Sequence, residues 1–529
     1  MLDINRQTGS YYTTDAIAEY MAGWAIRSSN DILLEPSFGD GIFIDKAWDT
    51  FQMLRNKAPE IHAVELQEQP YSRLLSRAKR PINAYNQDFL DFTLSPIIDA
   101  AIGNPPYVSL KNLPDLQQMK ALELINRQGM NISMNGSLWF PFLIHATTML
   151  REEGRLAFVM PYEIAYVRYA HKLWHYLGKN YSHITLIRIY EDFFPDVDVE
   201  TVLLLLDGKG GSTTRIDYKV YNAIEDLYNK DPVTESQISI YRIADGSKPF
   251  TSALLADEPT YLLMKLKDQG IIEPIIKSCK SKIGYVSADK KFFHPDRMTA
   301  REFGLPDDNF IPCILNSKDI NGGTGIGLQV TKGQCESRLY LPGKITPADE
   351  SYIKYGEETG VSQKYKCRQR KPWYVTPNVE TPDVIISVFG DVPKLIINDG
   401  DYAISNSLLC GSLKEGIDAK NFICRWYNSL TLLSIEMNVH SLGGGSLVII
   451  PGEADALDII KPLPQNLVDS IYKKLDAQML AGNTQDVYNL GDELVLKDVY
   501  QFTEKQIKAI REAVVDLRKW RIPNGRRNS

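Results

Sequence analysis

The stretch DAAIGNPPYV, Asp99–Val108, contains the feature around which the rest of the chain can be interpreted. Its apolar first half predicts a short buried strand bounded by turn-forming residues. Two prolines then end the strand, because proline has no amide hydrogen for a neighbouring strand. Asn104 precedes a proline and is therefore held extended. Its amide and the adjacent carbonyls are expected beyond the carboxyl end of a strand, where open α/β sheets bind ligands.

The residues Asn104, Pro105, Pro106 and Tyr107 suit one kind of substrate, a planar exocyclic amine. The two N–H donors of such an amine can meet the Asn104 side chain and a rigid backbone carbonyl, while its ring stacks on Tyr107. Asn and Pro are also common in turns that merely end a strand. The rest of the chain has to decide between these two interpretations.

A glycine-containing loop follows the first predicted strand, residues 32–34. The loop and the acid before it are Glu35, Pro36, Ser37, Phe38, Gly39, Asp40 and Gly41, and a helix is predicted from Ile42. Strand, glycine turn and helix open a nucleotide-type site, since glycine lets the backbone approach a ligand closely. An acid at the strand end, Glu35, suits an ammonium group.

Two further predicted strands also end in acids. The strand IHAVE ends in Glu65, a usual position for a carboxylate that accepts from a ribose diol. The next strand is followed by Asp88 and Phe89, which suit an adenine ring and its amine. Each acid alone could be a solvated strand end. Three of them at successive strand ends before residue 104 predict a cofactor site.

The remaining elements of the first half predict a doubly wound α/β fold. A helix is expected over residues 15–26, capped by Thr14 or Asp15. Residues 108–136 are polar and predict a mobile segment over the active site. Helices 137–150 and 169–180 alternate with strands, and residues 182–208 predict a final antiparallel pair. We therefore predict a mostly parallel sheet of about seven strands.

Length and composition indicate a cytoplasmic protein of more than one domain. The chain has 529 residues, of which 44% are apolar and 24% are charged. No apolar run approaches the roughly 20 residues of a membrane span, and the N-terminal MLDINRQTGSYY has no signal-peptide region. The six cysteines form no CxxC pair. No metal is predicted, because His171 and His175 lack both a third ligand and the glutamate of HExxH.

The net charge of −7 is unevenly distributed along the chain. Residues 1–208 hold 18 Lys and Arg against 25 Asp and Glu, leaving 41 of the 59 basic and 41 of the 66 acidic residues to the second half. Contacts with phosphate are therefore expected from local clusters in the second half rather than from bulk charge.

The second half begins after a linker, GKGGSTT at residues 208–214. Basic residues alternate with aromatic ones in two clusters, residues 277–293 and 364–375, which is typical of a groove that follows a nucleic-acid backbone. A solvated charged face is the alternative. Amphipathic helices are predicted at 465–482 and 503–520, and the glycine-rich stretch 443–445 has no assigned role. The candidate DNA-binding residues are Lys364, Lys366, Arg368, Arg370, Lys371, Trp373 and Tyr374.

Taken in order, the motifs of about residues 8–208 resemble those of the gamma-class amino-methyltransferases of DNA, typical of bacterial restriction–modification systems. The lead GSYYTT places Thr13 in the family's cofactor-contacting position, and residues 104–107 match its catalytic NPPY motif. Phe194, or its neighbour Phe193, matches the aromatic position that packs on the target base. The remaining matches are to the cofactor motifs at Glu35–Gly41, Glu65 and Asp88–Phe89.

The resemblance implies a bacterial or archaeal enzyme that methylates adenine at N6 with S-adenosyl-L-methionine. Residues 1–208 would form the catalytic domain and residues 215–529 a mixed α+β target-recognition domain. The base would be flipped out of duplex DNA and held between Tyr107 and Phe194, without a metal or a covalent intermediate. We expect a monomer that acts on double-stranded DNA, and a separate cognate restriction endonuclease is the partner that such a system allows.

Several alternatives use related chemistry. Cytosine-N4 methylation involves the same amine chemistry, although its usual motif begins with Ser rather than Asn. A release-factor glutamine methyltransferase also uses NPPY but lacks the long C-terminal domain, and an RNA methyltransferase would need an RNA-binding module that is not recognisable. A combined restriction enzyme would need a nuclease cluster, and a DNA-binding protein without catalysis would not need an intact NPPY.

Overall fold

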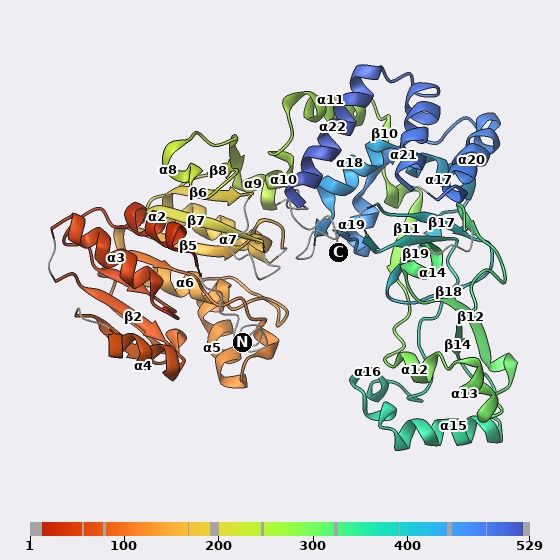
Figure 1. Ribbon diagram of the computed structural model, residues 1–529, viewed down its shortest axis with the longest axis horizontal. Helices are drawn as coiled ribbons and strands as arrows, with labels where there is room; N and C mark the ends of the chain where they lie inside the picture. The colour runs from red at the N-terminus through yellow and green to blue at the C-terminus, as the bar shows by residue number, and fades with distance from the viewer. Residues whose placement is uncertain are drawn as a thin grey trace. The chain divides into compact units, whose positions relative to one another are not determined.

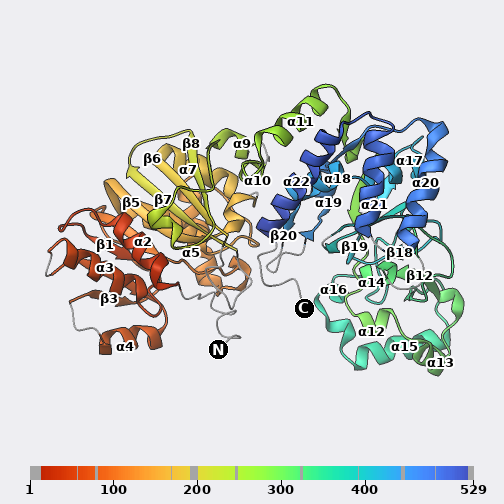
Figure 2. The same ribbon diagram turned by 45° about the horizontal axis from the view of Figure 1, so that its top comes forward.

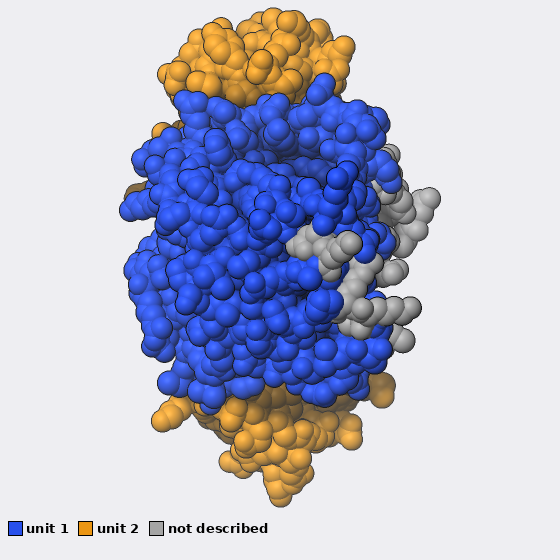
Figure 3. All heavy atoms as spheres, turned by 90° about the vertical axis from the view of Figure 1, so that its left-hand side faces the viewer, with its two compact units in different colours: residues 1–254, 523–529 blue, residues 255–522 orange. Residues whose placement is uncertain are grey.

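The computed structural model describes residues 13–55, 58–77, 81–167, 169–190, 200–244, 248–321, 326–390, 392–441, 447–482 and 484–521. It divides into two compact units, residues 1–254 with 523–529, and residues 255–522 (Figure 3). None of the helices that the structure describes combines the length and apolar character needed to cross a bilayer.

The first unit is built on a nine-stranded sheet in the order β3-β2-β1-β4-β5-β7-β6-β8-β9 (Figure 1). Five neighbouring pairs are parallel, and the pairs β5–β7, β6–β7 and β8–β9 are antiparallel. The strands are β1 (Leu33–Glu35), β2 (Ile61–Glu65), β3 (Asn83–Asn86), β4 (Ile98–Gly103), β5 (Leu150–Pro161), β6 (Tyr181–Ile189), β7 (Thr201–Lys209), β8 (Arg215–Tyr221) and β9 (Thr234–Ser239).

Helices cover both faces of this sheet. On one face, α2, α3 and Leu74 of α4 pack with β1, β4 and β5 in one apolar core, and Figures 1 and 2 show α2 and α3 side by side. On the other face, α6 contacts β5 and α7 contacts β6. The helices are α2 (Asp15–Ala25), α3 (Ile42–Met53), α4 (Glu68–Arg77), η1 (Phe89–Asp91), η2 (Leu110–Asn112), α5 (Asp115–Arg127), α6 (Trp139–Met149), η3 (Tyr162–Ala165), α7 (Ala170–Asn180), α8 (Asp226–Asn229), α9 (Ile240–Ala244) and α10 (Pro249–Ser252).

The predicted fold class is confirmed, with two additions. Strands β8 and β9 extend the predicted seven strands, because β8 pairs with β6 after the turn at residues 208–214. The main segment of the first compact unit consequently runs to Leu254, past the turn at residues 208–214. The predicted final antiparallel pair is β6 with β7.

The structure adds detail to two local predictions in the first unit. Thr14 stands at the N-cap of α2 but its side chain makes no cap hydrogen bond, and its hydroxyl is buried. Residues 108–136, predicted as a mobile polar segment, contain the regular helix α5, whose Ala121 and Ile125 are buried. Polarity along this segment reflects the exposed face of a helix rather than a lack of structure.

The second unit is a mixed α+β assembly. Its sheets are β11-β19-β15-β17-β13, β14-β12-β18, β16-β21-β20 and β10-β22. The strands are β10 (Ile272–Pro274), β11 (Cys279–Ile283), β12 (Phe310–Ile314), β13 (Gln329–Val330), β14 (Arg338–Tyr340), β15 (Val384–Ser387), β16 (Phe389–Gly390), β17 (Leu395–Asn398), β18 (Ala403–Ile404), β19 (Leu408–Leu413), β20 (His440–Ser441), β21 (Leu447–Val448) and β22 (Asp458–Ile460).

The helices of the second unit include both predicted amphipathic helices, which are α20 and α22. A buried carboxylate, Glu436 on α18, joins α18 to α22 by ion pairs with Arg518 and Arg521 at 2.8 and 2.9 Å. The helices are α11 (Asp257–Asp268), η4 (Ile275–Lys277), α12 (Lys290–Phe293), α13 (Arg297–Glu302), η5 (Asp307–Asn309), α14 (Ser317–Asn321), α15 (Pro347–Glu358), η6 (Val361–Gln363), α16 (Tyr365–Arg368), α17 (Ala419–Trp426), α18 (Ser429–Asn438), α19 (Pro451–Ala456), α20 (Gln465–Leu480), α21 (Thr484–Gly491), η7 (Asp492–Lys497) and α22 (Glu504–Arg521).

Candidate cofactor and catalytic site

The order of the strands creates a ligand site between β1 and β4. The chain runs from β1 outward to β3 and then returns to place β4 on the other side of β1. Such a switch point leaves a crevice outside the carboxyl ends of the two strands. Ser37, after β1, and Asn104, after β4, meet there, because the Ser37 hydroxyl donates to the Asn104 carbonyl at 3.2 Å.

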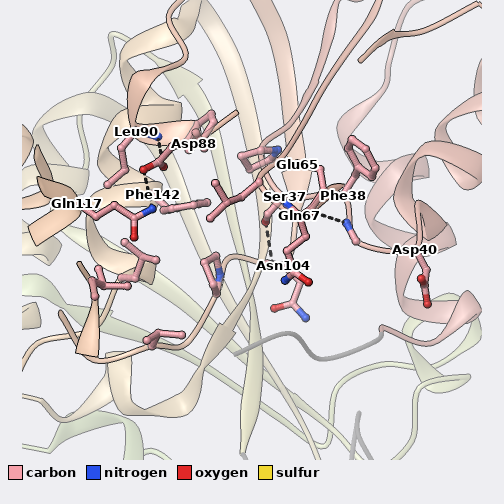
Figure 4. Close-up of a pocket in the computed structure, with 18 of the residues that line it drawn as sticks. Ser37, Phe38, Asp40, Glu65, Gln67, Asp88, Leu90, Asn104, Gln117 and Phe142 are labelled. Carbon is pink, nitrogen blue, oxygen red and sulfur yellow. Dashed lines mark hydrogen bonds between the residues drawn. The ribbon is translucent and has the colours of Figure 1, made fainter. Parts of the chain in front are cut away.

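A pocket of about 590 Å³ opens at this edge of the sheet (Figure 4). This volume lies within the range of small-molecule and cofactor sites. The predicted site residues that line it are Thr13, Pro36, Ser37, Phe38, Gly39, Glu65, Asp88, Phe89, Asn104 and Pro106. The sequence pattern therefore brought together residues from the ends of four strands. Their roles as cofactor ligands stay a prediction.

The loop after β1 is a tight backbone turn. Gly39 and Gly41 have φ angles of +51° and +83°, the left-handed region that favours glycine. The Gly41 amide donates to the Phe38 carbonyl at 2.7 Å and closes the turn. Gly41 itself lies behind the pocket as the N-cap of α3, where an added Cβ would come within 2.8 Å of Arg77.

Glu35, predicted to meet an ammonium group, is fully buried and lies beneath the turn rather than in the pocket lining. One of its oxygens accepts from the Ser37 amide at 3.2 Å, and the other has no hydrogen-bond partner among the described residues. Burial, with the nearby Glu65 adding to it, raises the pKa of Glu35 well above its usual value. Gly103 makes room for this carboxyl, since a Cβ there would lie 2.6 Å from it.

Glu65 ties the end of β2 to the glycine turn. Its two oxygens accept from the Gly39 amide at 2.9 Å and the Gln67 amide at 2.8 Å. Burial raises the pKa of Glu65 even though these amides oppose the shift. A carboxylate oxygen has two lone pairs, so both oxygens keep acceptor capacity toward the pocket.

The predicted acid–aromatic pair after β3 also faces the pocket. Asp88 accepts from the Leu90 amide at 3.0 Å and from the Gln117 side chain at 2.8 Å. Phe89 packs against Phe142 of α6 with ring centroids 5.0 Å apart. Figure 4 shows Asp88, Leu90, Gln117 and Phe142 gathered on one side of the pocket and Asp40 on the other.

The NPPY motif follows β4, all six residues of which are buried. The Asn104 amide nitrogen lies 3.4 Å from the Thr13 hydroxyl, to which it donates. The Tyr107 hydroxyl donates to the Val159 carbonyl at 3.0 Å, which fixes the ring against β5. Pro105 and Tyr107 do not line the pocket. Phe193 and Phe194, the predicted partners of Tyr107, lie outside the described residues.

Sequence reasoning missed the wall of the pocket that residues 112–142, from η2 to α6, supply. The residues Asn112, Leu113, Pro114, Gln117, Leu138 and Phe142 line it. They belong to no motif, and only the spacing of buried residues within 115–127 could have indicated a helix there. Among the described residues, no cluster of histidine, cysteine, aspartate and glutamate could hold a metal ion.

In the candidate DNA-binding cluster of the second unit, some side chains contact other residues of the unit and others are exposed. Lys364 pairs with Asp289 at 2.5 Å, and Arg370 donates to the backbone carbonyls of residues 286 and 287. Trp373 packs against Phe292 with tilted rings whose centroids lie 5.1 Å apart. Tyr374 packs against the same core. Lys364, Lys366, Arg368 and Lys371 are exposed, and of these Lys364 is held by its ion pair with Asp289.

The sheet order and the acid-lined pocket at its switch point define a doubly wound α/β enzyme of the methyltransferase type. The family model described as Eco57I restriction-modification methylase matches residues 42–194, and the C-terminal domain of type II methyltransferase M.Eco57I matches residues 247–496. The chain therefore carries Eco57I-type restriction–modification methylase domains.

Similar proteins agree with this assignment. The chain is 22% identical to type II methyltransferase M.AccI of Acinetobacter calcoaceticus over 73% of this chain and 72% of that protein. It is 22% identical to type II methyltransferase M.BstVI of Geobacillus stearothermophilus over 74% and 78%. Its fold is similar to that of the type IIL restriction-modification enzyme MmeI, solved in complex with DNA, with a TM-score of 0.60, 13% identity, and 94% and 73% coverage.

Proposed function

We propose that this protein transfers a methyl group from S-adenosyl-L-methionine to the N6 amine of an adenine in double-stranded DNA. The observation that carries the proposal is the hydrogen bond between the Ser37 hydroxyl and the Asn104 carbonyl at 3.2 Å. It joins the glycine turn of the pocket to the NPPY motif. A donor of methyl groups and an acceptor amine can therefore be bound on adjoining surfaces.

The hydrogen-bond acceptors that line the pocket suit an adenosyl cofactor. Two acidic residues, Glu65 and Asp88, follow neighbouring parallel strands, and each has oxygens with acceptor capacity left. Glu65 would accept from the ribose hydroxyls and Asp88 from the adenine amine, with Phe89 beside the ring. Gly39 would allow close approach of the backbone. When bound, the cofactor supplies a methyl group activated by its sulfonium.

The chain's own residues account for activation of the target amine. Asn104 and the carbonyl of Pro105 would accept the two N6–H donors, which draws electron density onto a nitrogen whose lone pair is otherwise delocalised into the ring. Tyr107, held through its hydroxyl, would stack on the base, a contribution of about 1–3 kcal/mol. A base inside a duplex is out of reach, so it must be flipped out, with Phe194 as the second stacking residue.

Recognition of DNA is assigned to the second compact unit, residues 255–522, because strands β8 and β9 of the predicted domain 215–529 belong to the sheet of the first unit. The exposed cations Lys366, Arg368 and Lys371 suit contacts with the phosphate backbone, and the similar enzyme MmeI was solved with DNA. The protein would act as a monomer and protect host DNA in a restriction–modification system, alongside a separate endonuclease.

A methyl-transfer assay tests this proposal. Labelled S-adenosyl-L-methionine and unmethylated plasmid DNA are incubated with the protein, and the nucleosides are analysed, with Asn104→Ala as the control. We expect label in N6-methyladenosine. Label in N4-methylcytosine would keep the mechanism and change the base, and absence of label from DNA would overturn the proposal.

A further inference from the structure

The segment between β4 and α6 forms a closed excursion with α5 at its far part. Its two ends are joined by backbone hydrogen bonds from the Leu110 amide to the Gly136 carbonyl at 2.8 Å and from the Leu138 amide to the Val108 carbonyl at 2.8 Å. The helix is thereby held beside the pocket, which its residue Gln117 and the preceding Leu113 help to line.

Two side chains one turn apart on α5 reach the loop after β3. Gln117 donates to Asp88 at 2.8 Å, and Lys120 pairs with Asp91 at 2.6 Å. Gln117 and Asp88 line the pocket, whereas Lys120 and Asp91 do not. The ion pair outside the pocket can tether the helix without help from Gln117. The glutamine amide is therefore available for a second task.

That task concerns the orientation of the Asp88 carboxylate. The Leu90 amide donates to one of its oxygens at 3.0 Å and the Gln117 side chain to the other at 2.8 Å. With one donor on each oxygen, the carboxylate plane is fixed and one lone pair per oxygen remains. The remaining lone pairs accept hydrogen bonds and cannot donate them.

We propose that Gln117 is a positioning residue that makes the site selective for a 6-aminopurine over a 6-oxopurine. The inference rests on the proposed function, because it takes Asp88 as the acceptor for the cofactor's adenine amine. A fixed carboxylate accepts from the amine but meets a 6-oxo group acceptor to acceptor. A site built for one hydrogen-bonding partner rejects analogues that lack it, and this rejection depends on the carboxylate keeping its orientation.

The test measures binding by calorimetry with two ligands, S-adenosylhomocysteine and its deaminated analogue S-inosylhomocysteine. We expect Gln117→Ala, and the nearly isosteric Gln117→Met, to weaken binding of the adenosyl ligand by roughly tenfold. Binding of the inosyl ligand should change little, so the ratio of the two affinities falls. A residue that only supports the fold would weaken both ligands equally.

Three further variants make the test specific. Lys120→Ala should leave the ratio unchanged, because it removes only the tether outside the pocket. Gln128→Ala, an exposed glutamine just after the same helix, should change neither affinity. In an Asp88→Ala background, Gln117→Ala should add little, since the two side chains act as one unit.

The outcomes separate this inference from the proposed function. A wild-type protein that binds the adenosyl ligand, together with Gln117 variants of unchanged ratio, would overturn the inference and leave the proposed function in place. Full additivity of the Asp88 and Gln117 changes would overturn it as well. A wild-type protein that binds neither ligand would overturn the proposed cofactor and the inference with it.

Discussion

The cofactor pocket of the first unit and the basic cluster at residues 364–374 of the second show how differently two sequence patterns become structure. The predicted pocket residues come from the ends of four strands and meet around one cavity. The predicted cluster residues are neighbours in sequence, yet Lys364, Arg370 and Trp373 have contacts within their own unit.

The difference follows from what fixes each position. Parallel strands in one sheet end at a common edge, so residues such as Glu65 and Asn104 are placed by backbone geometry. A surface lysine or arginine is placed by competition among nearby partners. Lys364 pairs with Asp289, and Arg370 donates to two backbone carbonyls. Lys366, Arg368 and Lys371 are exposed to solvent.

The largest effect is expected for Asn104→Ala, which should reduce methyl transfer by at least about a hundredfold. The variant removes an acceptor that acts on the reacting amine, and polar groups of this kind are each worth roughly 10²–10³ in rate. Activity is measured with labelled cofactor and plasmid DNA.

Cofactor binding provides the control for this variant, because the proposed role of the Asn104 side chain is on the target amine and its hydrogen bond to Thr13 in the pocket is long, at 3.4 Å. S-Adenosylhomocysteine should still bind within a few-fold of wild type. Turnover at the wild-type rate would contradict the proposed mechanism.

A smaller effect is expected for the exposed cations of the second unit. Replacing Lys366, Arg368 and Lys371 together by Ala should weaken DNA binding and reduce the salt dependence of the affinity by roughly 0.9 in slope for each lost phosphate contact. Binding is titrated at several salt concentrations. An unchanged slope would show that these three residues do not contact the DNA backbone.

Arg370→Ala should act on stability instead. Its guanidinium donates to the carbonyls of Val286 and Ser287 and lies 5.5 Å from the Phe293 ring. Leaving these partly buried carbonyls without a donor costs about 1–3 kcal/mol. Denaturant unfolding should show this loss, while Lys366→Ala, a matched exposed change, should leave stability within about 0.5 kcal/mol of wild type. The opposite ranking would show that the contacts of Arg370 within its unit do not stabilise the fold.

The sequence predicted the pocket well for a physical reason, and it failed where side-chain competition decides. Glycine turns, prolines and strand-terminal acids constrain the backbone locally, so the turns at residues 35–41 and 104–107 could be located without a structure, although Glu35, Gly41, Pro105 and Tyr107 do not line the pocket. Strands β8 and β9 and the helix α5 carry no such motif. The burial of Glu35 beneath its own turn depends on Gly103, a residue far along the chain, and could not be inferred from local pattern.

Glu35→Gln tests whether that burial costs stability, and its effect should be the smallest. The pKa of Glu35 is raised well above 4.5 by burial, so the folded state favours the protonated carboxyl. The contribution of Glu35 to the free energy of unfolding should therefore be fully present below about pH 4.5, and it should be lost as the pH rises through the pKa of the folded state. Glutamine mimics the protonated form and should remove this loss.

The melting temperature of the first unit, identified by its shift with S-adenosylhomocysteine, reports the effect. We expect Glu35→Gln to melt about 2–4 °C higher than wild type at pH 8 and within error of it at pH 4.5. Glu123→Gln, an exposed change on α5, should show no such pH-dependent gain. A variant that is destabilised at pH 8 would mean that the ionised carboxylate holds the glycine turn together. The pocket residues would then depend on a side-chain contact as well as on backbone geometry. The difference drawn above between the pocket and the basic cluster would no longer hold.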